Sequence, residues 1–234
     1  MNARHLQTLN ERVNPDFKPD KEDYYISLTT TNDLAERINL EELSLSSKRA
    51  YRYEGHLKGE FEGRNLPTNE VLAFKAGAQV MLLNNDPMGR WVNGTIGKVV
   101  SVEEKADAVD VVNVALSDGR KVGVTPFTWE MHRFYYNEAT EKLDSEVVGS
   151  FTQYPLKLAW AVTIHKSQGK TFSKVIIDFG QGTFSHGQAY VALSRCTSFK
   201  GLVLRRPLLA RHVILDTRVV DFVNKYQASL DCVK

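Results

Sequence analysis

The sequence predicts an α/β fold: a parallel sheet with flanking helices, into which a small β-barrel is inserted. An apolar run at 158–164 is followed by a polar cluster and then by a β-branched run at 175–177, which is typical of a buried strand. A helix is predicted over 187–196 and a further strand over 201–205. Short β segments separated by turn residues occupy 95–151, and their spacing favours a small barrel.

The N-terminal part begins with a polar stretch, residues 1–23, whose two prolines indicate a linker or an entering arm. We expect such an arm to lead in from a longer protein. A strand is predicted over 24–31. Asn32 or Asp33 is then expected to cap a helix that runs to about Leu45.

The inserted barrel is assigned to residues 95–151, and the α/β domain to residues 24–94 and 152–234. Within the insertion, Asp118-Gly119 predicts a hairpin turn between two short strands. A group of aromatic side chains near its end is interpreted as barrel core, with stacking on single-stranded bases as the alternative: Trp129, Phe134, Tyr135 and Tyr136.

The C-terminal stretch, residues 207–233, predicts a short connector and a final helix. Its apolar side chains are expected to form one face that packs on the domain: Ile214, Val219, Val220, Phe222, Val223 and Tyr226.

The composition excludes several classes of protein. Of 234 residues, 42% are hydrophobic and 25% charged, which is ordinary for a globular protein. No apolar run reaches the roughly 18 residues of a membrane span, and the N-terminus lacks an apolar signal core. Two cysteines, Cys196 and Cys232, suffice neither for a disulfide framework nor for a metal site. We therefore expect a cytoplasmic protein that has no membrane association and binds no metal of its own.

The charge is unevenly distributed, although the net charge is only +2. Residues 157–211 contain nine Lys and Arg but a single acid, Asp178. This segment also contains the polar cluster His165-Lys166-Ser167-Gln168-Gly169 and, at the end of the predicted helix, Arg195. The planar guanidinium of an arginine is well suited to a phosphoryl oxygen pair. The segment is therefore suited to a polyphosphate, either a nucleotide or a nucleic-acid backbone.

Two short motifs in this segment carry a family resemblance. TIHKSQG, Thr163 to Gly169, and VALSR, Val191 to Arg195, resemble motifs V and VI of superfamily 1 DNA helicases, most closely the 5′→3′ Pif/RecD group. The stretch LTTTNDLAERIN, which starts at Leu28, resembles motif IV of the same group. The resemblance implies a RecA-like second motor domain, with an SH3-like barrel as the insertion.

The resemblance also implies roles for individual residues. Arg195 would be the catalytic arginine that neutralises charge on the γ-phosphoryl group. The nucleotide-binding positions would be Gln168, Gly169, Lys170 and Gln188, although Gln188 could equally just pack the helix. The DNA-binding positions would be Thr30, Asn32, Thr163, His165 and Lys166, with a buried structural histidine as the alternative for His165.

Two expected features of such an enzyme are absent from the sequence. A G-x-x-x-x-G-K-[ST] phosphate loop does not occur, because the first glycine is missing before Gly169-Lys170-Thr171. No Asp-Glu pair follows a predicted strand as a magnesium site would require. ATP and Mg²⁺ are therefore expected to bind mainly to an N-terminal motor domain outside this chain, and the chain alone is expected to be inactive.

The expected partners are single-stranded DNA or a single-strand/duplex junction and that N-terminal domain, in a protein that works as a monomer. Two other hypotheses stay open. The chain could be a stand-alone nucleic-acid-binding or adaptor protein with a degenerate helicase fold. It could also belong to the alpha subunit of an exonuclease-V-like complex, in DNA repair and recombination.

Overall fold

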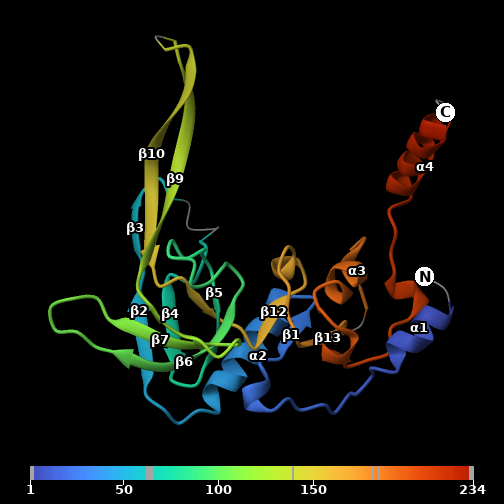
Figure 1. Cartoon of the computed structure of the whole chain (residues 1–234), viewed down its shortest axis with the longest axis horizontal. Helices are drawn as coiled ribbons and strands as arrows, with labels where there is room; N and C mark the ends of the chain where they lie inside the picture. Colours follow the sequence, from blue (N-terminus) through green and yellow to red (C-terminus); the bar gives the residue numbers. More distant parts are fainter. Residues whose placement is uncertain (1–2, 62–65, 139, 181, 184, 232–234) are drawn as a thin grey trace. The chain divides into compact units, whose positions relative to one another are not determined.

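The computed structural model describes residues 3–61, 66–138, 140–180, 182–183 and 185–231, and the chain forms two compact units. Unit 1 combines Met1–Ile38 with Ala161–Lys234, and unit 2 is Asn39–Trp160. Each unit is described by itself below. Figure 1 traces the whole chain, with the segments of unit 1 in blue and in orange to red.

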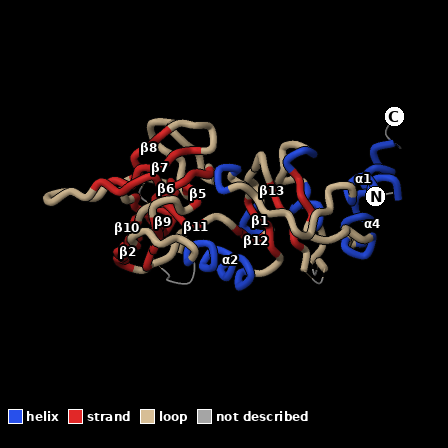
Figure 2. The backbone as a smooth tube through the Cα atoms, turned by 90° about the horizontal axis from the view of Figure 1, so that it is seen from below, coloured by secondary structure: helices blue, strands red, loops and turns tan. Residues whose placement is uncertain are grey.

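Unit 1 is built on a parallel sheet of four strands in the order β12-β1-β13-β14. Figure 2 shows three of these strands, β12, β1 and β13, side by side. Nearly every residue of the sheet is buried, as expected when helices and loops cover both faces of a parallel sheet. The prediction of an α/β fold around a parallel sheet is confirmed. The strands are β1 (Ile26–Thr29), β12 (Ala161–Thr163), β13 (Val175–Asp178) and β14 (Leu202–Leu204).

The helices described in unit 1 range from single 3₁₀ turns to α4 with 15 residues. They are α1 (Ala3–Asn10), η1 (Lys21–Asp23), α2 (Asn32–Ser44), η3 (His165–Ser167), α3 (Gln188–Leu193), η4 (Phe199–Gly201), η5 (Ala210–His212) and α4 (Thr217–Asp231). Helix α2 continues into unit 2.

The N-terminal segment, expected as a linker or arm, lies along the edge strand of unit 1. The Arg12 guanidinium donates to the carbonyl oxygens of Leu202 (2.8 Å) and Lys200 (2.9 Å). Val13 forms a parallel bridge with Leu204, and the backbone N–H of Asn14 donates to the Leu204 carbonyl (2.9 Å). The segment therefore extends the sheet beyond β14 instead of hanging free.

Unit 2 is all antiparallel apart from the end of α2. Its sheets have the orders β11-β5-β6-β7-β8, β3-β10-β9 and β2-β4. The strands are β2 (Ala50–Glu54), β3 (His56–Gly59), β4 (Val71–Lys75), β5 (Gln79–Leu82), β6 (Ile96–Glu103), β7 (Val111–Leu116), β8 (Lys121–Val124), β9 (Phe127–Asn137), β10 (Lys142–Gln153) and β11 (Leu156–Leu158). The compact unit begins before residue 95, so it is larger than the predicted insertion. The SH3-like barrel at 95–151 stays a prediction.

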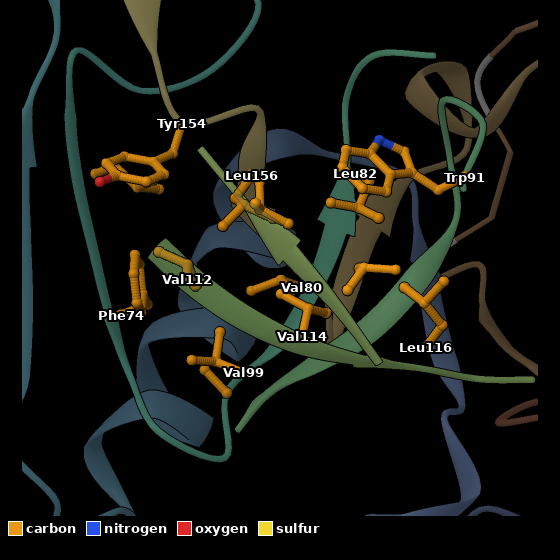
Figure 3. Close-up of a cluster of buried hydrophobic side chains, with 14 residues drawn as sticks. Phe74, Val80, Leu82, Trp91, Val99, Val112, Val114, Leu116, Tyr154 and Leu156 are labelled. Carbon is orange, nitrogen blue, oxygen red and sulfur yellow. The ribbon is translucent and has the colours of Figure 1, made fainter. Parts of the chain in front are cut away.

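The core of unit 2 is formed by strands that lie on both sides of the predicted insertion boundaries (Figure 3). Phe74 is fully buried and stacks on Tyr51 and Tyr53, with ring centroids 6.0 and 5.9 Å apart. The buried side chains of the cluster are Leu72, Phe74, Ala78, Val80, Leu82, Trp91, Val99, Val112, Val114, Leu116, Val122, Val124, Tyr154 and Leu156.

The turn-rich stretch that joins β5 to β6 is fixed by an ion pair. The Asp86 carboxylate accepts from Arg90 at both oxygens, at 2.8 and 2.7 Å, and it also accepts the backbone N–H groups of Met88 and Arg90. Hydrogen bonds from Arg90 hold the pKa of Asp86 down, at about 2. The guanidinium also lies over the ring of Trp91, 4.6 Å from its centroid.

The aromatic cluster of unit 2 does not form a core, so the preferred interpretation of it was wrong. Strands β9 and β10 form a long hairpin that extends beyond the rest of its unit (Figure 1). Phe134, Tyr135 and Tyr136 lie on this extension with exposed fractions of 66, 46 and 61%. Trp129 alone is partly covered, because it lies near the base of the hairpin and stacks on Phe151.

The final helix also differs from expectation. Helix α4 was predicted to pack on the domain through its apolar face, yet that face is exposed: Val219, Val220, Phe222, Val223 and Tyr226. The rings of Phe222 and Tyr226 stack on each other instead, with centroids 6.4 Å apart. No helix in the described part of the chain is long and apolar enough to cross a membrane.

Candidate nucleic-acid and nucleotide interface

The residues expected to contact DNA come from two strands that are neighbours in the sheet. Strand β1 pairs with β12 in parallel, with Thr29 opposite Thr163, and the backbone N–H of Ile164 donates to the Thr29 carbonyl at 2.9 Å. The residues that follow each strand therefore leave the sheet at the same carboxyl-terminal edge, where ligands bind in open α/β sheets.

The side chains at this edge differ in accessibility. Asn32, His165 and Lys166 are exposed, and Thr30 is half-buried. Thr163 is only 5% exposed, and its Oγ1 accepts the backbone N–H of Lys166 at 3.3 Å. Thr163 therefore fixes the turn that presents the next residues.

The turn after β12 is held by short-range hydrogen bonds. The Ser167 hydroxyl is fully buried and donates to the Ile164 carbonyl at 2.6 Å. The backbone N–H of Gln168 donates to His165, and that of Lys170 donates to Ser167. Gly169 between them has a φ of +76°, a conformation that a side chain would disfavour. Gln168 is exposed, so its amide is accessible on this turn.

Strand β1 leads into helix α2, and a side-chain hydroxyl caps the start of this helix. Thr31, and not Asn32 or Asp33, caps the helix, because its Oγ1 accepts the backbone N–H of Leu34 (3.4 Å). The Thr29 hydroxyl donates to the Thr31 carbonyl at 3.0 Å. Asn32 is therefore not used as the cap and is exposed in the first turn.

Arg195 lies just beyond the end of α3, and three hydrogen bonds hold its guanidinium. Nε donates to the Val191 carbonyl (2.9 Å), Nη1 to the Lys170 carbonyl (2.9 Å) and Nη2 to the Ser194 hydroxyl (2.9 Å). These acceptors are two carbonyls and a hydroxyl, not carboxylates. The positive charge of Arg195 is therefore still available to an anion.

The two sequence motifs meet at this arginine. Besides the Arg195–Lys170 hydrogen bond, the backbone N–H of Phe172 donates to the Arg195 carbonyl (2.8 Å), and that of Thr197 donates to the Phe172 carbonyl (3.0 Å). Phe172 also forms a parallel bridge with Cys196. The chain that follows the turn after β12 is thus joined to the end of α3 by both backbone and side-chain hydrogen bonds.

The remaining expected nucleotide-binding residues lie in different environments. Lys170 is half-buried, and burial lowers the pKa of its ammonium group. Gln188 in the first turn of α3 is only 2% exposed, whereas Tyr190 is 74% exposed. Gly187 precedes the helix with a φ of +70°, which favours glycine at that position.

Asp178, the one acid of the basic segment, is also at this edge. It ends β13 opposite Thr29, and its carboxylate accepts the backbone N–H of Gly180 at 2.8 Å. Arg206 pairs with it at 3.6 Å and donates to the Gly180 carbonyl. The acid is thereby partly neutralised. Among the described residues, no group of three or more His, Cys, Asp or Glu could hold a metal ion.

Comparison with known proteins identifies the family. A helicase family model, Herpes_Helicase, matches residues 133–225. ATP-dependent DNA helicase Pif1 of Bdellovibrio bacteriovorus is 39% identical over 163 residues, which is 69% of this chain and 33% of that protein. Human ATP-dependent DNA helicase PIF1 is 39% identical over 158 residues, which is 67% of this chain and 22% of that protein.

The solved structure of unliganded Pif1 from Bacteroides sp. is similar to 97% of this chain, with a TM-score of 0.85 and 32% identity. The chain belongs to the Pif1-like DNA helicases of superfamily 1. It corresponds to their C-terminal region, and its parallel unit matches a RecA-like helicase domain. This Pif1-like chain spans about half of the Bacteroides protein and one third of the Bdellovibrio protein.

Two functional candidates in the Pif1-like chain were given no role from the sequence. Ser167 was part of a polar cluster, and Ser194 was noted only as the neighbour of Arg195. Their hydroxyls prove to hold the turn after β12 and the arginine, respectively. The available signal was spacing, because a serine can bond the carbonyl three residues earlier in a turn or helix. That signal does not reveal the bond from Arg195.

Proposed function

We propose that this chain is the C-terminal part of an ATP-dependent DNA helicase that couples hydrolysis to translocation on single-stranded DNA and to duplex unwinding. The observation that carries the proposal is the hydrogen bond from Arg195 to the Lys170 carbonyl, which joins a cation suited to phosphoryl oxygens to the turn suited to DNA. Relatives of the chain are named ATP-dependent DNA helicases, and Bacteroides Pif1 has been solved with single-stranded DNA and with ADP-AlF4.

In the proposed mechanism, Arg195 faces a nucleotide held mainly by an N-terminal motor domain. Its guanidinium neutralises charge on the γ-phosphoryl group as the bond to the leaving oxygen breaks, a contribution of roughly 10³–10⁵ in rate. Gln168, Gly169, Lys170 and Gln188 are proposed to line the same side of that nucleotide. Of these, Gln168 is accessible, whereas Gln188 is buried in the first turn of α3.

The DNA strand is proposed to run along the carboxyl-terminal edge of β1 and β12. Lys166 provides a charge for a phosphate, while His165, Asn32 and Thr30 provide further polar contacts. These are backbone contacts, so binding should not depend on sequence. Thr163 contributes by holding the backbone N–H of Lys166.

The turn between β12 and Lys170 provides a physical path between the two ligands. It is stiff, because Ser167, Gln168 and Lys170 each bond back three residues, and it ends on the carbonyl that Arg195 holds. Closure of the two motor domains around the triphosphate would therefore move the DNA-side residues together with the arginine. Hydrolysis would allow the two domains to separate again, so that the DNA contacts shift stepwise along the strand.

Magnesium and most of the triphosphate contacts are proposed to lie outside this chain. The donor set described here contains cations and amides, which suit phosphate oxygens, but no acidic cluster that would suit Mg²⁺. The chain alone is accordingly expected to lack ATPase activity. A stand-alone nucleic-acid-binding protein is the second candidate, favoured by the absence of a phosphate loop in this sequence.

The test uses the parent protein that contains the N-terminal motor domain. Arg195→Ala should lower DNA-stimulated kcat by roughly 10³–10⁵ while the affinity for single-stranded DNA is retained. Arg211→Ala, which removes an exposed arginine of unit 1, is the control and should leave kcat unchanged. Normal turnover by Arg195→Ala would refute the proposal. Upstream coding sequence without a phosphate loop would favour the binding-protein alternative.

A further inference from the structure

The guanidinium of Arg195 is held by three hydrogen bonds, although an arginine at the end of a short helix needs none of them for the helix to form. It has five N–H donors, and three of them are used by Val191, Lys170 and Ser194. One N–H is left on each terminal nitrogen for a ligand. The plane and direction of those two remaining donors are set by the three internal acceptors.

Two of these acceptors are backbone carbonyls, and one is a side chain. Ser194 is the C-cap of α3, and its backbone N–H already donates to the Tyr190 carbonyl at 2.9 Å. Its hydroxyl donates its only proton to the Val191 carbonyl at 3.0 Å. The oxygen of that hydroxyl must therefore be the acceptor towards Nη2 of Arg195, and the polarity of the pair is determined.

The three groups form a closed arrangement. The Val191 carbonyl accepts from both the Ser194 hydroxyl and Nε of Arg195, while the Ser194 oxygen accepts from Nη2. The Ser194 side chain is exposed, so it contributes little to the core. A serine at this position needs only its bond to the i−3 carbonyl to be explained structurally. The second bond, to the arginine, is the one that calls for a functional account.

We infer that Ser194 is the positioning residue of Arg195, orienting the guanidinium so that its two remaining N–H groups face the γ-phosphoryl oxygens. The inference rests on the proposed function of Arg195. A hydroxyl can hold this nitrogen without neutralising it, whereas a carboxylate at the same place would cancel the charge that the transition state needs. The group at position 194 thus provides orientation while the positive charge is preserved.

The expected loss of kcat in Ser194→Ala depends on the hydrogen bonds to Arg195 that remain in the variant. Hydrogen bonds to charged groups are among the stronger ones, but the carbonyls of Lys170 and Val191 still hold Nη1 and Nε when the hydroxyl is removed. We therefore expect Ser194→Ala to lower kcat about tenfold, far less than loss of the arginine itself. Ser194→Thr retains the hydroxyl and should restore most of kcat.

The experiment measures steady-state ATP hydrolysis by the parent helicase on single-stranded DNA, with Ser173→Ala as control. Ser173 is an exposed serine of the same unit, and its hydroxyl takes no part in this arrangement. Ser194→Ala should lower kcat and the affinity for ADP with aluminium fluoride by similar factors. KM for ATP and the affinities for ADP and DNA should hardly change, because the arginine is oriented for the transition state.

Three results would overturn the inference. The first is an unchanged or raised kcat in Ser194→Ala, and the second is a kcat that Ser194→Thr does not restore. The third is an equal loss of affinity for ADP and DNA in Ser194→Ala, which would indicate that the variant disrupts the fold. Arg195→Ala separates this inference from the proposed function. If Arg195→Ala abolishes hydrolysis and Ser194→Ala does not lower it, only the role of Ser194 fails. If Arg195→Ala hydrolyses ATP normally, the proposed function fails first.

Discussion

Lys166 offers the most direct quantitative test of the proposed DNA-binding edge. It is the only lysine or arginine among the five proposed DNA contacts, and its side chain is exposed on η3 directly after β12. Its backbone N–H is bonded to Thr163, a bond that alanine preserves. Lys166→Ala should therefore remove one cation from the edge and leave the turn intact.

The expected change in the salt dependence of DNA affinity follows from the release of counterions when a cation binds a phosphate. One phosphate contact contributes about 0.7 to the slope of log affinity against log salt for a single strand. Lys166→Ala should lower the magnitude of that slope by about 0.7, equally for different base sequences. Between about 50 mM and about 200 mM salt, the ratio of the parent affinity to the variant affinity should shrink about 2.6-fold.

The assay is fluorescence anisotropy with labelled oligonucleotides of two unrelated sequences, measured over a salt series with this chain and with the parent helicase. Lys200→Ala is a matched control, because Lys200 is exposed on η4, which precedes β14. In a parallel sheet, residues before one strand lie at the opposite edge from residues after another. An unchanged slope for Lys166→Ala, or an equal change for Lys200→Ala, would refute the assignment of the DNA to this edge.

Two further predictions concern the stability of unit 1. Gly201→Ala should destabilise it by about 1–3 kcal/mol, because a Cβ at this buried position would overlap the Ser173 carbonyl; thermal unfolding measures the loss, and an unchanged midpoint would contradict it. Burial, and next the charge of Arg211, lower the pKa of His212, whose Nδ1 also accepts the Leu209 N–H. As the pH falls through about 6.5, His212 is protonated in the unfolded chain before it is protonated in the folded one, so the free energy of unfolding of unit 1 should decrease. NMR titration should give a pKa of His212 below that value, and this pKa should rise in Arg211→Ala.

Much of the fold could be predicted because its signals are local. The β-branched run at 175–177 and the strand predicted over 201–205 became β13 and β14, and the helix expected from residue 32 became α2. The cap of α2 was misplaced by one or two residues, since Thr31, Asn32 and Asp33 can all bond a backbone N–H. Local sequence does not decide which of them faces the helix end.

The exposed aromatic residues show where local patterns fail. Phe134, Tyr135 and Tyr136 are apolar enough for a core, but burial requires other elements to cover them. Their cross-strand partners on β10 are Ser145, Asp144 and Leu143, on a two-stranded extension that leaves the three aromatic side chains exposed. Helix α4 is a similar case, because its amphipathic sequence specifies an apolar face but not a surface for it to contact.

The sequence by itself determined the chemistry: a basic segment with one acid, two motifs that identify the helicase family, and an arginine suited to phosphoryl oxygens. These are properties of residue type and spacing, which need no fold to be recognised. The tertiary structure alone decided what these residues contact. Thr29 and Thr163 meet because β1 and β12 pair in register, although they are far apart in the chain. Arg195 is held by the Lys170 carbonyl because folding brings the end of α3 against the turn after β12, and spacing does not encode such a contact.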